Sequence, residues 1–227
     1  MSTDAAAPLP PSTTRSLSQV QQAHQRIEHL IITLVLPPGE IVTEAGIANL
    51  LNIGRTPVRE ALQHLAREGL VVILPKRGIL VSSIDIRRQL RMLEFRRVIA
   101  GFVVRAAAER STAAERTAFA DYAARFEAVA RSRDAESFHA LDDGFASALI
   151  DCARNEFASN ALRQTHALCR RFIHAFDRDG EMLQRNAENQ AALAQALAAG
   201  EAEAALARLT ALLDAVEAFT RATLDRP

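Results

Sequence analysis

Polar side chains suited to hydrogen bonding with DNA bases cluster in one short segment. Thr56, Arg59 and Gln63 are three and four residues apart, so a helix would project them from one edge. Arg55 begins the same segment and adds a second arginine. Arginine can donate two parallel hydrogen bonds to a guanine edge, and glutamine can pair in the same way with adenine. We therefore predict that these four residues contact the major groove of double-stranded DNA.

A helix over this segment has one apolar face, which would hold the polar edge outward. Its apolar residues recur at the spacing of one helix face, at Val58, Ala61, Leu62, Leu65 and Ala66. Pro57 is compatible with a helix because its missing N–H lies in the first turn, where it has no partner to lose. A shorter apolar segment opens at Thr43 and ends in the turn 52–54, so the two segments predict a helix-turn-helix.

A hairpin with a basic tip follows the second helix. Aliphatic and β-branched residues favour strands at 70–74 and 79–82. The turn between them holds Lys76, Arg77 and Gly78, so we expect these residues to follow the sugar-phosphate backbone as a wing. Each part alone has a simpler explanation, because an arginine-bearing helix is usually a solvated face and a basic turn is usually only a turn. Their ordered occurrence favours DNA binding.

The same region resembles the winged helix-turn-helix of GntR-type bacterial transcription regulators. The motifs that carry the resemblance are PPGE (37–40), TEAGIANLL (43–51), RTPVREAL (55–62), LAREGLV (65–71) and PKRGILV (75–81). The resemblance implies DNA contacts by Arg55, Thr56, Arg59 and Gly78. The chain departs from the family pattern at Ala45, where an arginine is usual, and at Gly54, where serine or threonine is usual.

Composition places the chain among ordinary globular proteins, with 49% hydrophobic and 24% charged residues. It contains no run of eighteen apolar residues, so we expect no membrane span. The two cysteines form no CxxC motif, which fits a reducing cytoplasm, and residues 1–16 have the composition of a disordered tail. Residues 15–91 hold ten Lys/Arg against six Asp/Glu, whereas residues 92–227 hold seventeen against twenty, so the DNA-binding part is the basic one.

The rest of the chain is predicted to be helical almost throughout. Glycine and proline are rare after residue 86, and alanine is abundant. Helices are expected at about 86–110, 112–132, 135–151, 155–176, 181–199 and 201–224. The predicted fold class is therefore mainly α, with a winged helix-turn-helix at 17–83 and an antiparallel helical bundle at 84–227 that binds an effector and dimerises.

This helical part resembles the FCD-type effector domain of the FadR subgroup. The resemblance rests on LEFRRVIAGF (93–102), LDDGFASAL (141–149), ASNAL (158–162) and GEAEAAL (200–206). Many such domains bind a divalent metal through one aspartate and three histidines. Asp142 occupies the aspartate position, but the histidine positions hold Ala146, Asn189 and Leu212. One carboxylate cannot hold a transition metal tightly, so we predict no metal cofactor at this set.

The remaining polar candidates for an effector pocket are Arg96, Asp142 and Asn189. Arg96 could bind an effector carboxylate in a bidentate way. Alternatively, Arg96 and Asp142 form an internal ion pair with no ligand role. His139, His166 and His174 could replace the missing metal ligands, or His166 and His174 could lie on a solvated helix face together with Arg163 and Arg170.

We therefore expect a cytoplasmic, homodimeric transcription regulator that binds a palindromic operator and responds to a small organic effector that carries a carboxylate. A dimer is expected because one short recognition helix contacts few base pairs, and a two-fold pair doubles the site. A constitutive regulator with a degenerate effector pocket is an alternative. An enzyme in the helical domain is a weaker alternative, because the chain lacks a Gly-rich phosphate loop, an HExxH motif and a nucleophile with an identifiable base.

Overall fold

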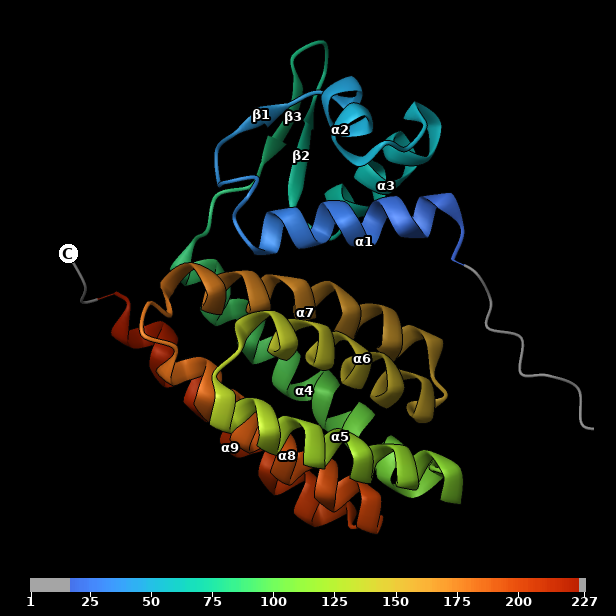
Figure 1. Cartoon of the computed structure of the whole chain (residues 1–227). Coiled ribbons are helices and arrows are strands. Elements are labelled where there is room, and N and C mark those ends of the chain that lie inside the picture. The colour runs from blue at the N-terminus through green and yellow to red at the C-terminus, as the bar shows by residue number, and fades with distance from the viewer. Residues whose placement is uncertain (1–16, 225–227) are drawn as a thin grey trace, which may run out of the picture.

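The computed structural model describes residues 17–224 and places a small mixed domain on top of a helical bundle (Figure 1). The predicted tail at 1–16 lies outside the described residues. The upper part comprises α1 (Gln19–Ile32), β1 (Ile41–Val42), α2 (Glu44–Leu51), α3 (Arg55–Arg67), β2 (Val71–Leu74) and β3 (Gly78–Val81). The bundle comprises α4 (Ile86–Arg110), α5 (Ala113–Ser132), α6 (Ala135–Ala153), α7 (Glu156–Phe176), α8 (Glu181–Ala199) and α9 (Ala202–Ala222).

Local capping sets the helix-turn-helix. The Thr43 hydroxyl caps α2 by accepting a hydrogen bond from the backbone N–H of Gly46 at 3.0 Å. Asn52 ends α2 in the left-handed conformation, and Gly54 precedes α3 without a side-chain cap. The face of α3 predicted to be apolar is buried at Val58, Ala61, Leu62 and Leu65, while Ala66 is half-buried.

The hairpin of β2 and β3 belongs to a three-stranded antiparallel sheet in the order β1-β3-β2. Val72 pairs with Leu80 across the hairpin, and Ile41 of β1 pairs with Leu80 on the other side. The sequence pattern did not indicate β1, because two residues are too few to show an alternation. The pattern also did not single out α1, which buries Ala23, Ile27, Ile31 and Ile32 in the core of this domain.

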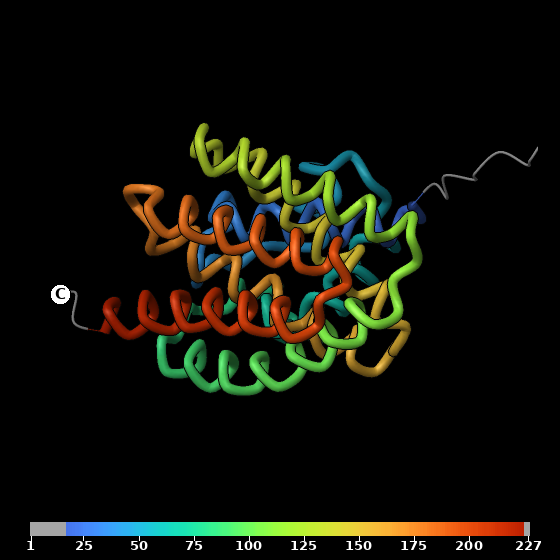
Figure 2. The backbone as a smooth tube through the Cα atoms, turned by 90° about the horizontal axis from the view of Figure 1, so that it is seen from below, coloured from blue at the N-terminus to red at the C-terminus, as the bar shows by residue number. Residues whose placement is uncertain are grey.

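The bundle consists of two layers below the winged helix. Figure 2 shows α4, α9, α8 and α5 side by side in that order, and each adjacent pair is in contact. α6 and α7 lie between this layer and the upper domain (Figure 1). Helix bounds agree closely with the sequence expectation because they follow local signals. Thr112 and Glu115 form a capping box at the start of α5, and Gly200 ends α8 at a φ of +73°.

The two hydrophobic cores meet where α1 packs against α7. One core gathers buried residues of the upper domain between Ala23 and Val81, and Ala167 of α7 joins it. The other gathers buried residues of the bundle between Leu93 and Val216. Arg171 adds a polar link, because its guanidinium donates a 2.7 Å hydrogen bond to the backbone carbonyl of Ser82. Burial lowers the pKa of Arg171 to about 10, so this contact is well shielded from water.

None of the described helices is both long and apolar enough to span a bilayer.

Candidate functional site

The predicted DNA-contacting residues of α3 all have exposed side chains. Arg55, Thr56, Arg59 and Gln63 lie on the side of α3 opposite to its buried face, with the first three in or near the first turn. The apolar back of α3 packs against α1, which gives the polar edge a rigid support. A short helix with this arrangement has the geometry required for contacts in the major groove.

The predicted wing tip is also exposed, and the hairpin points away from the bundle (Figure 1). Lys76 adopts a positive φ of 60° in the turn, and Arg77 follows it. Gly78 is required by the backbone, because its φ is +111° and an added Cβ would lie 2.7 Å from the carbonyl oxygen of Val42. Glycine therefore allows the wing to pass close to β1 and hold its two cations at the tip.

Arg59 is bound to a partner that the sequence did not indicate. Its Nε lies 3.1 and 2.9 Å from the two carboxylate oxygens of Glu44, and a guanidinium nitrogen lies 2.9 Å from one of them. The Arg59 side chain is 60% exposed, so the pair contributes little to stability and can open. Glu44 therefore orients Arg59 in the free protein and must release it before the arginine can bind a base. The 15-residue separation explains why no helical spacing pointed to this pair.

The effector residues predicted from sequence lie partly around one small cavity inside the bundle. Arg96, Asp142 and Leu212 line it, with a volume of about 40 Å³. Asn189 does not line it, because the neighbouring Asn186 and Gln190 of α8 occupy that side. Room of this size accommodates only a few water molecules. Binding of an organic effector here therefore requires side chains to move.

The carboxylate of Asp142 is buried, and neighbouring side chains already hydrogen-bond to it and balance its charge. It accepts a 2.9 Å hydrogen bond from the amide of Gln190, and its other oxygen lies 3.3 Å from His166 Nε2 and 3.9 Å from Arg170 Nε. Arg96 instead donates a 2.9 Å hydrogen bond to the hydroxyl of Thr165. The internal Arg96–Asp142 ion pair considered from sequence is not among the ion pairs of residues 17–224. This leaves part of the Arg96 guanidinium available for another acceptor.

The suggestion that the histidine face of α7 is solvated is wrong for His166 and Arg170, whereas Arg163 on the same face is 51% exposed. The side chain of His166 is only 14% exposed and that of Arg170 only 5%. α7 has an apolar face toward the bundle, but α6 and α1 cover its polar face as well. The sequence pattern could not show this, because polar residues covered by other polar residues have the same periodicity as a solvated face.

The donor set that the FCD resemblance implies does not fit a metal. Ala146 and Leu212 have no donor atom, and Asn189 lies away from the cavity that Asp142 lines. The three histidines do not gather around Asp142 either. His139 Nε2 lies 3.3 Å from His174 Nδ1, whereas His166 lies beside Asp142 and Asp143.

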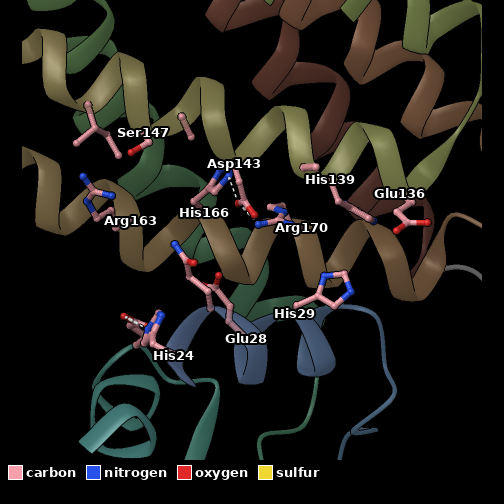
Figure 3. Close-up of a pocket in the computed structure, with 15 residues that line it drawn as sticks. His24, Glu28, His29, Glu136, His139, Asp143, Ser147, Arg163, His166 and Arg170 are labelled. Carbon is pink, nitrogen blue, oxygen red and sulfur yellow. Dashed lines mark hydrogen bonds and ion pairs between the residues drawn. The ribbon is translucent and has the colours of Figure 1, made fainter. Parts of the chain in front are cut away.

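A larger cavity of about 530 Å³ lies between the two domains, bounded by α1, α6 and α7. Figure 3 shows Glu28 and His29 of α1 facing α7, where Arg170 pairs with Asp143 of α6. Burial tends to raise the pKa of Asp143, but hydrogen bonds from His166 and Arg170 and their positive charges outweigh it, so the pKa is lowered. His139, His166 and Arg170 line both this cavity and the small one, which makes the two cavities neighbours.

Two family models match the chain in sequence. Residues 19–81 match the model for bacterial regulatory proteins of the gntR family, and residues 91–215 match the FCD domain. An uncharacterised HTH-type transcriptional regulator of Agrobacterium vitis is 32% identical over 151 residues, which cover 61% of this chain and 82% of the relative. The HTH-type transcriptional repressor RspR of Escherichia coli K12 is 26% identical over 147 residues, which cover 65% of this chain and 64% of RspR.

Solved structures show the same fold. The E. coli protein McbR/YncC superposes with a TM-score of 0.79 at 19% identity, covering 92% of this chain and all of the other. A regulator described as a putative GntR protein from Rhodococcus sp. RHA1 superposes with a TM-score of 0.62 at 23% identity, covering 91% of this chain and 99% of the other. The matched families and relatives are transcriptional regulators rather than enzymes.

The buried histidine between the two cavities makes stability depend on pH. Burial, followed by the charges of Arg170 and His174, lowers the pKa of His139 from 6.5 to about 4. Between these two values the unfolded chain binds a proton that the folded chain does not, so stability is lost as the pH falls through this window. We expect the free energy of unfolding to fall between pH 7.5 and pH 5 by about 1–2 kcal/mol less in the His139→Gln variant than in the wild type. Urea unfolding at both pH values measures this, and equal losses in the two proteins would contradict it.

Proposed function

Because the chain belongs to the GntR family of bacterial transcription regulators and carries an FCD domain, we propose that it binds an operator through α3 and its wing and senses a small organic effector through its bundle. One observation carries the DNA-binding part. Exposed arginine, threonine and glutamine side chains occupy the outer edge of α3, whose back is buried, next to a hairpin with two exposed cations at its tip. Such a protein acts where DNA is, which is the cytoplasm of a bacterium.

In this proposal the two elements contact different parts of double-stranded DNA. Arg55, Thr56, Arg59 and Gln63 enter the major groove and contact base edges. The wing residues Lys76, Arg77 and Gly78 follow the backbone or the adjacent minor groove and hold the register without specifying sequence. Release of Arg59 from Glu44 costs little, since the pair is exposed. A DNA sequence that offers Arg59 no hydrogen-bond acceptor would not compensate for the loss of its contact with Glu44, so such a sequence would bind more weakly.

We also propose that the protein is a homodimer that binds a palindromic operator. Phe95, Val98 and Phe102 are three and four residues apart on α4, so they share one face, and they are 49%, 71% and 44% exposed. An exposed apolar stripe on a long helix is a feature of protein–protein contact surfaces. A second copy packed against this stripe would bury it and pair two winged helices on two half-sites.

The effector part of the proposal rests on Arg96, with Asp142 as a second candidate in the same cavity. Arg96 lines the small cavity, donates a hydrogen bond to the hydroxyl of Thr165, and has a second guanidinium nitrogen 3.4 Å from His166 Nδ1. A carboxylate would pair with its free donors. The cavity's volume of about 40 Å³ favours the alternative of a constitutive regulator, because this space admits no organic ligand without rearrangement.

Substitution of Arg59 tests the DNA contact. We expect Arg59→Ala to weaken binding to a selected operator by about 1–3 kcal/mol, whereas Lys76→Ala should weaken all DNA sequences alike and reduce the salt dependence. Gel-shift titrations on selected and scrambled duplexes separate the two effects. Arg67→Ala is the matched control, because Arg67 is an exposed arginine in the last turn of the same helix. Wild-type operator affinity in Arg59→Ala would refute the proposed groove geometry.

A charge placed in the apolar stripe tests the dimer. Val98→Glu should convert the dimer to a monomer at micromolar concentration, because a buried unpaired carboxylate is costly at such an interface. Light scattering on the full chain measures the mass. Val35→Glu serves as the control, since Val35 is 61% exposed but lies outside the stripe. A wild type that is monomeric, or a Val98→Glu protein that remains dimeric, would contradict the proposed interface.

A thermal-shift screen against small carboxylates distinguishes a responsive regulator from a constitutive one. A carboxylate that binds the folded state should raise the melting temperature, and Arg96→Gln should abolish the rise. Arg163→Gln is the control, because Arg163 lies on α7 with its side chain 51% exposed. If no carboxylate shifts the wild type while operator binding is intact, the constitutive alternative holds.

A further inference from the structure

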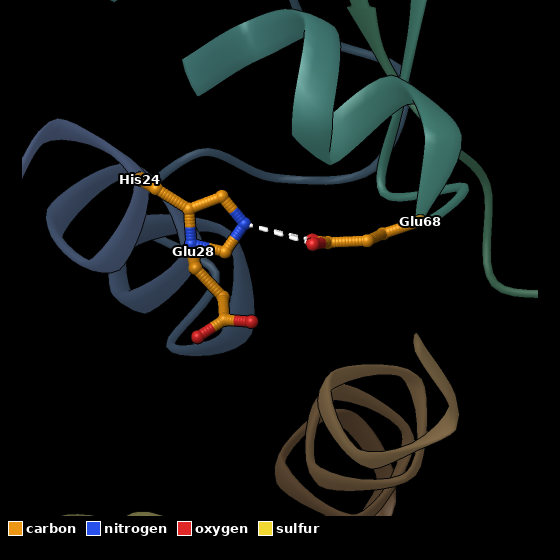
Figure 4. A group of neighbouring side chains, drawn as sticks. All are labelled: His24, Glu28 and Glu68. Carbon is orange, nitrogen blue, oxygen red and sulfur yellow. Dashed lines mark hydrogen bonds and ion pairs between the residues drawn. The ribbon is translucent and has the colours of Figure 1, made fainter. Parts of the chain in front are cut away.

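A histidine and two glutamates gather on the winged-helix side of the large cavity, away from the FCD-type set at Asp142 (Figure 4). His24 and Glu28 lie one turn apart on α1, so their side chains share a helix face. Glu68 follows the last residue of α3 and brings its carboxylate to the same point. Each of the three residues offers one ligand atom, and these atoms all lie within 4.8 Å of one another.

The chemistry of this group matches a first-row divalent metal. Imidazole nitrogen and carboxylate oxygen bind Zn²⁺ at about 2.0–2.2 Å, which places tetrahedral ligand atoms about 3.3 Å apart. His24 Nε2 already lies 3.0 and 2.9 Å from the two oxygens of Glu68. The ligand atom of Glu28 lies within 4.8 Å of the other two, so its side chain would move closer to complete the set around one ion.

Glu28 lacks the partner that a half-buried carboxylate needs. Within residues 17–224, no group donates a hydrogen bond to Glu28 or forms an ion pair with it. Burial raises its pKa, and the positive charges of His24 and Arg170 only partly oppose this effect. The carboxylate of Asp143, across the cavity, raises the pKa further. A bound cation would give this carboxylate the direct contact that no hydrogen bond or ion pair among residues 17–224 provides.

We propose that His24, Glu28 and Glu68 form a site for a divalent transition metal such as Zn²⁺. The fourth coordination position of this site is open and faces the interdomain cavity. The site goes beyond the proposed operator and effector functions. It joins α1, which packs on α7, to the end of α3, which carries the DNA-contacting residues. Metal binding therefore fixes the recognition helix relative to the helix that docks the bundle. The open position leaves room for water or for an acidic ligand in the cavity.

Protons compete with the metal at this site. Burial tends to lower the pKa of His24, but its hydrogen bond to Glu68 and the negative charges of Glu68 and Glu28 outweigh burial and raise it. The metal needs neutral imidazole and ionised carboxylates, so binding releases protons. Affinity for the metal should therefore increase between pH 6 and pH 7.5.

The test is a titration of the full-length protein, stripped with a chelator, with Zn²⁺ by calorimetry and with Co²⁺ by visible absorption. We expect one ion per chain, with tighter binding at pH 7.5 than at pH 6. Glu28→Gln keeps the size of the side chain and should weaken binding more than about tenfold, as should His24→Gln. Two controls are matched to these variants. Asp142→Asn removes the remaining FCD-type ligand, and Glu136→Gln changes an exposed glutamate on the opposite wall of the same cavity.

Both controls should bind Zn²⁺ like the wild type. Unchanged affinity in Glu28→Gln and His24→Gln would overturn the proposal and leave His24–Glu68 as an ordinary ion pair. Loss of binding in Asp142→Asn would also overturn it and place the metal in the bundle. Melting curves without metal show whether each variant is folded, and gel shifts of the metal-free variants show whether DNA binding persists. The metal site and the operator function can thus fail separately.

Discussion

The packing of α1 against α7 connects the two halves of this regulator, and the other contacts depend on it. Ala167 of α7 enters the core of the winged helix, and Arg171 donates a hydrogen bond to the carbonyl of Ser82 at the end of β3. Burial of Arg171 costs desolvation, so it is tolerated only with a partner in place. Because α1 also supports the back of α3, the position of the recognition helix follows from the position of α7.

Because of the same contact, part of the polar face of α7 lies between the interdomain cavity and the small cavity inside the bundle. Arg170 lies between Asp142 and Asp143 and acts electrostatically on Glu28 of α1. Charges in this shielded region interact more strongly than they would in water. His139, His166 and Arg170 line both cavities, so a ligand in either one would change the surroundings of the other. This gives a physical route from the bundle to the winged helix, because the altered groups lie on the helix that docks α1.

On the proposed DNA-binding surface the charged side chains are exposed, so their interactions with one another are weak. The pairing of Arg59 with Glu44 orders the arginine side chain, and in the proposed complex DNA would replace the carboxylate at little cost because the pair is exposed. Gly78 serves the wing through the backbone alone, because no other residue avoids the carbonyl of Val42 at that φ. The DNA-binding surface is thus rigid in its backbone and adaptable in its side chains.

The sequence by itself determined the helices from α2 to α9, the hairpin and the exposed edge of α3, because these depend on hydrogen bonds and periodicities within a few residues. It did not indicate α1 or β1. It also indicated that the FCD-type metal ligands are incomplete, since Ala146 and Leu212 have no donor atom. Only the tertiary structure decided that His166 and Arg170 on the polar face of α7 are covered, and that Gln190 rather than Asn189 contacts Asp142. The cluster of His24, Glu28 and Glu68 likewise needed the fold, because Glu68 is 44 residues from His24. Whether a polar helix face contacts water or another polar face depends on which helix packs against it, and the periodicity of the sequence does not identify that helix.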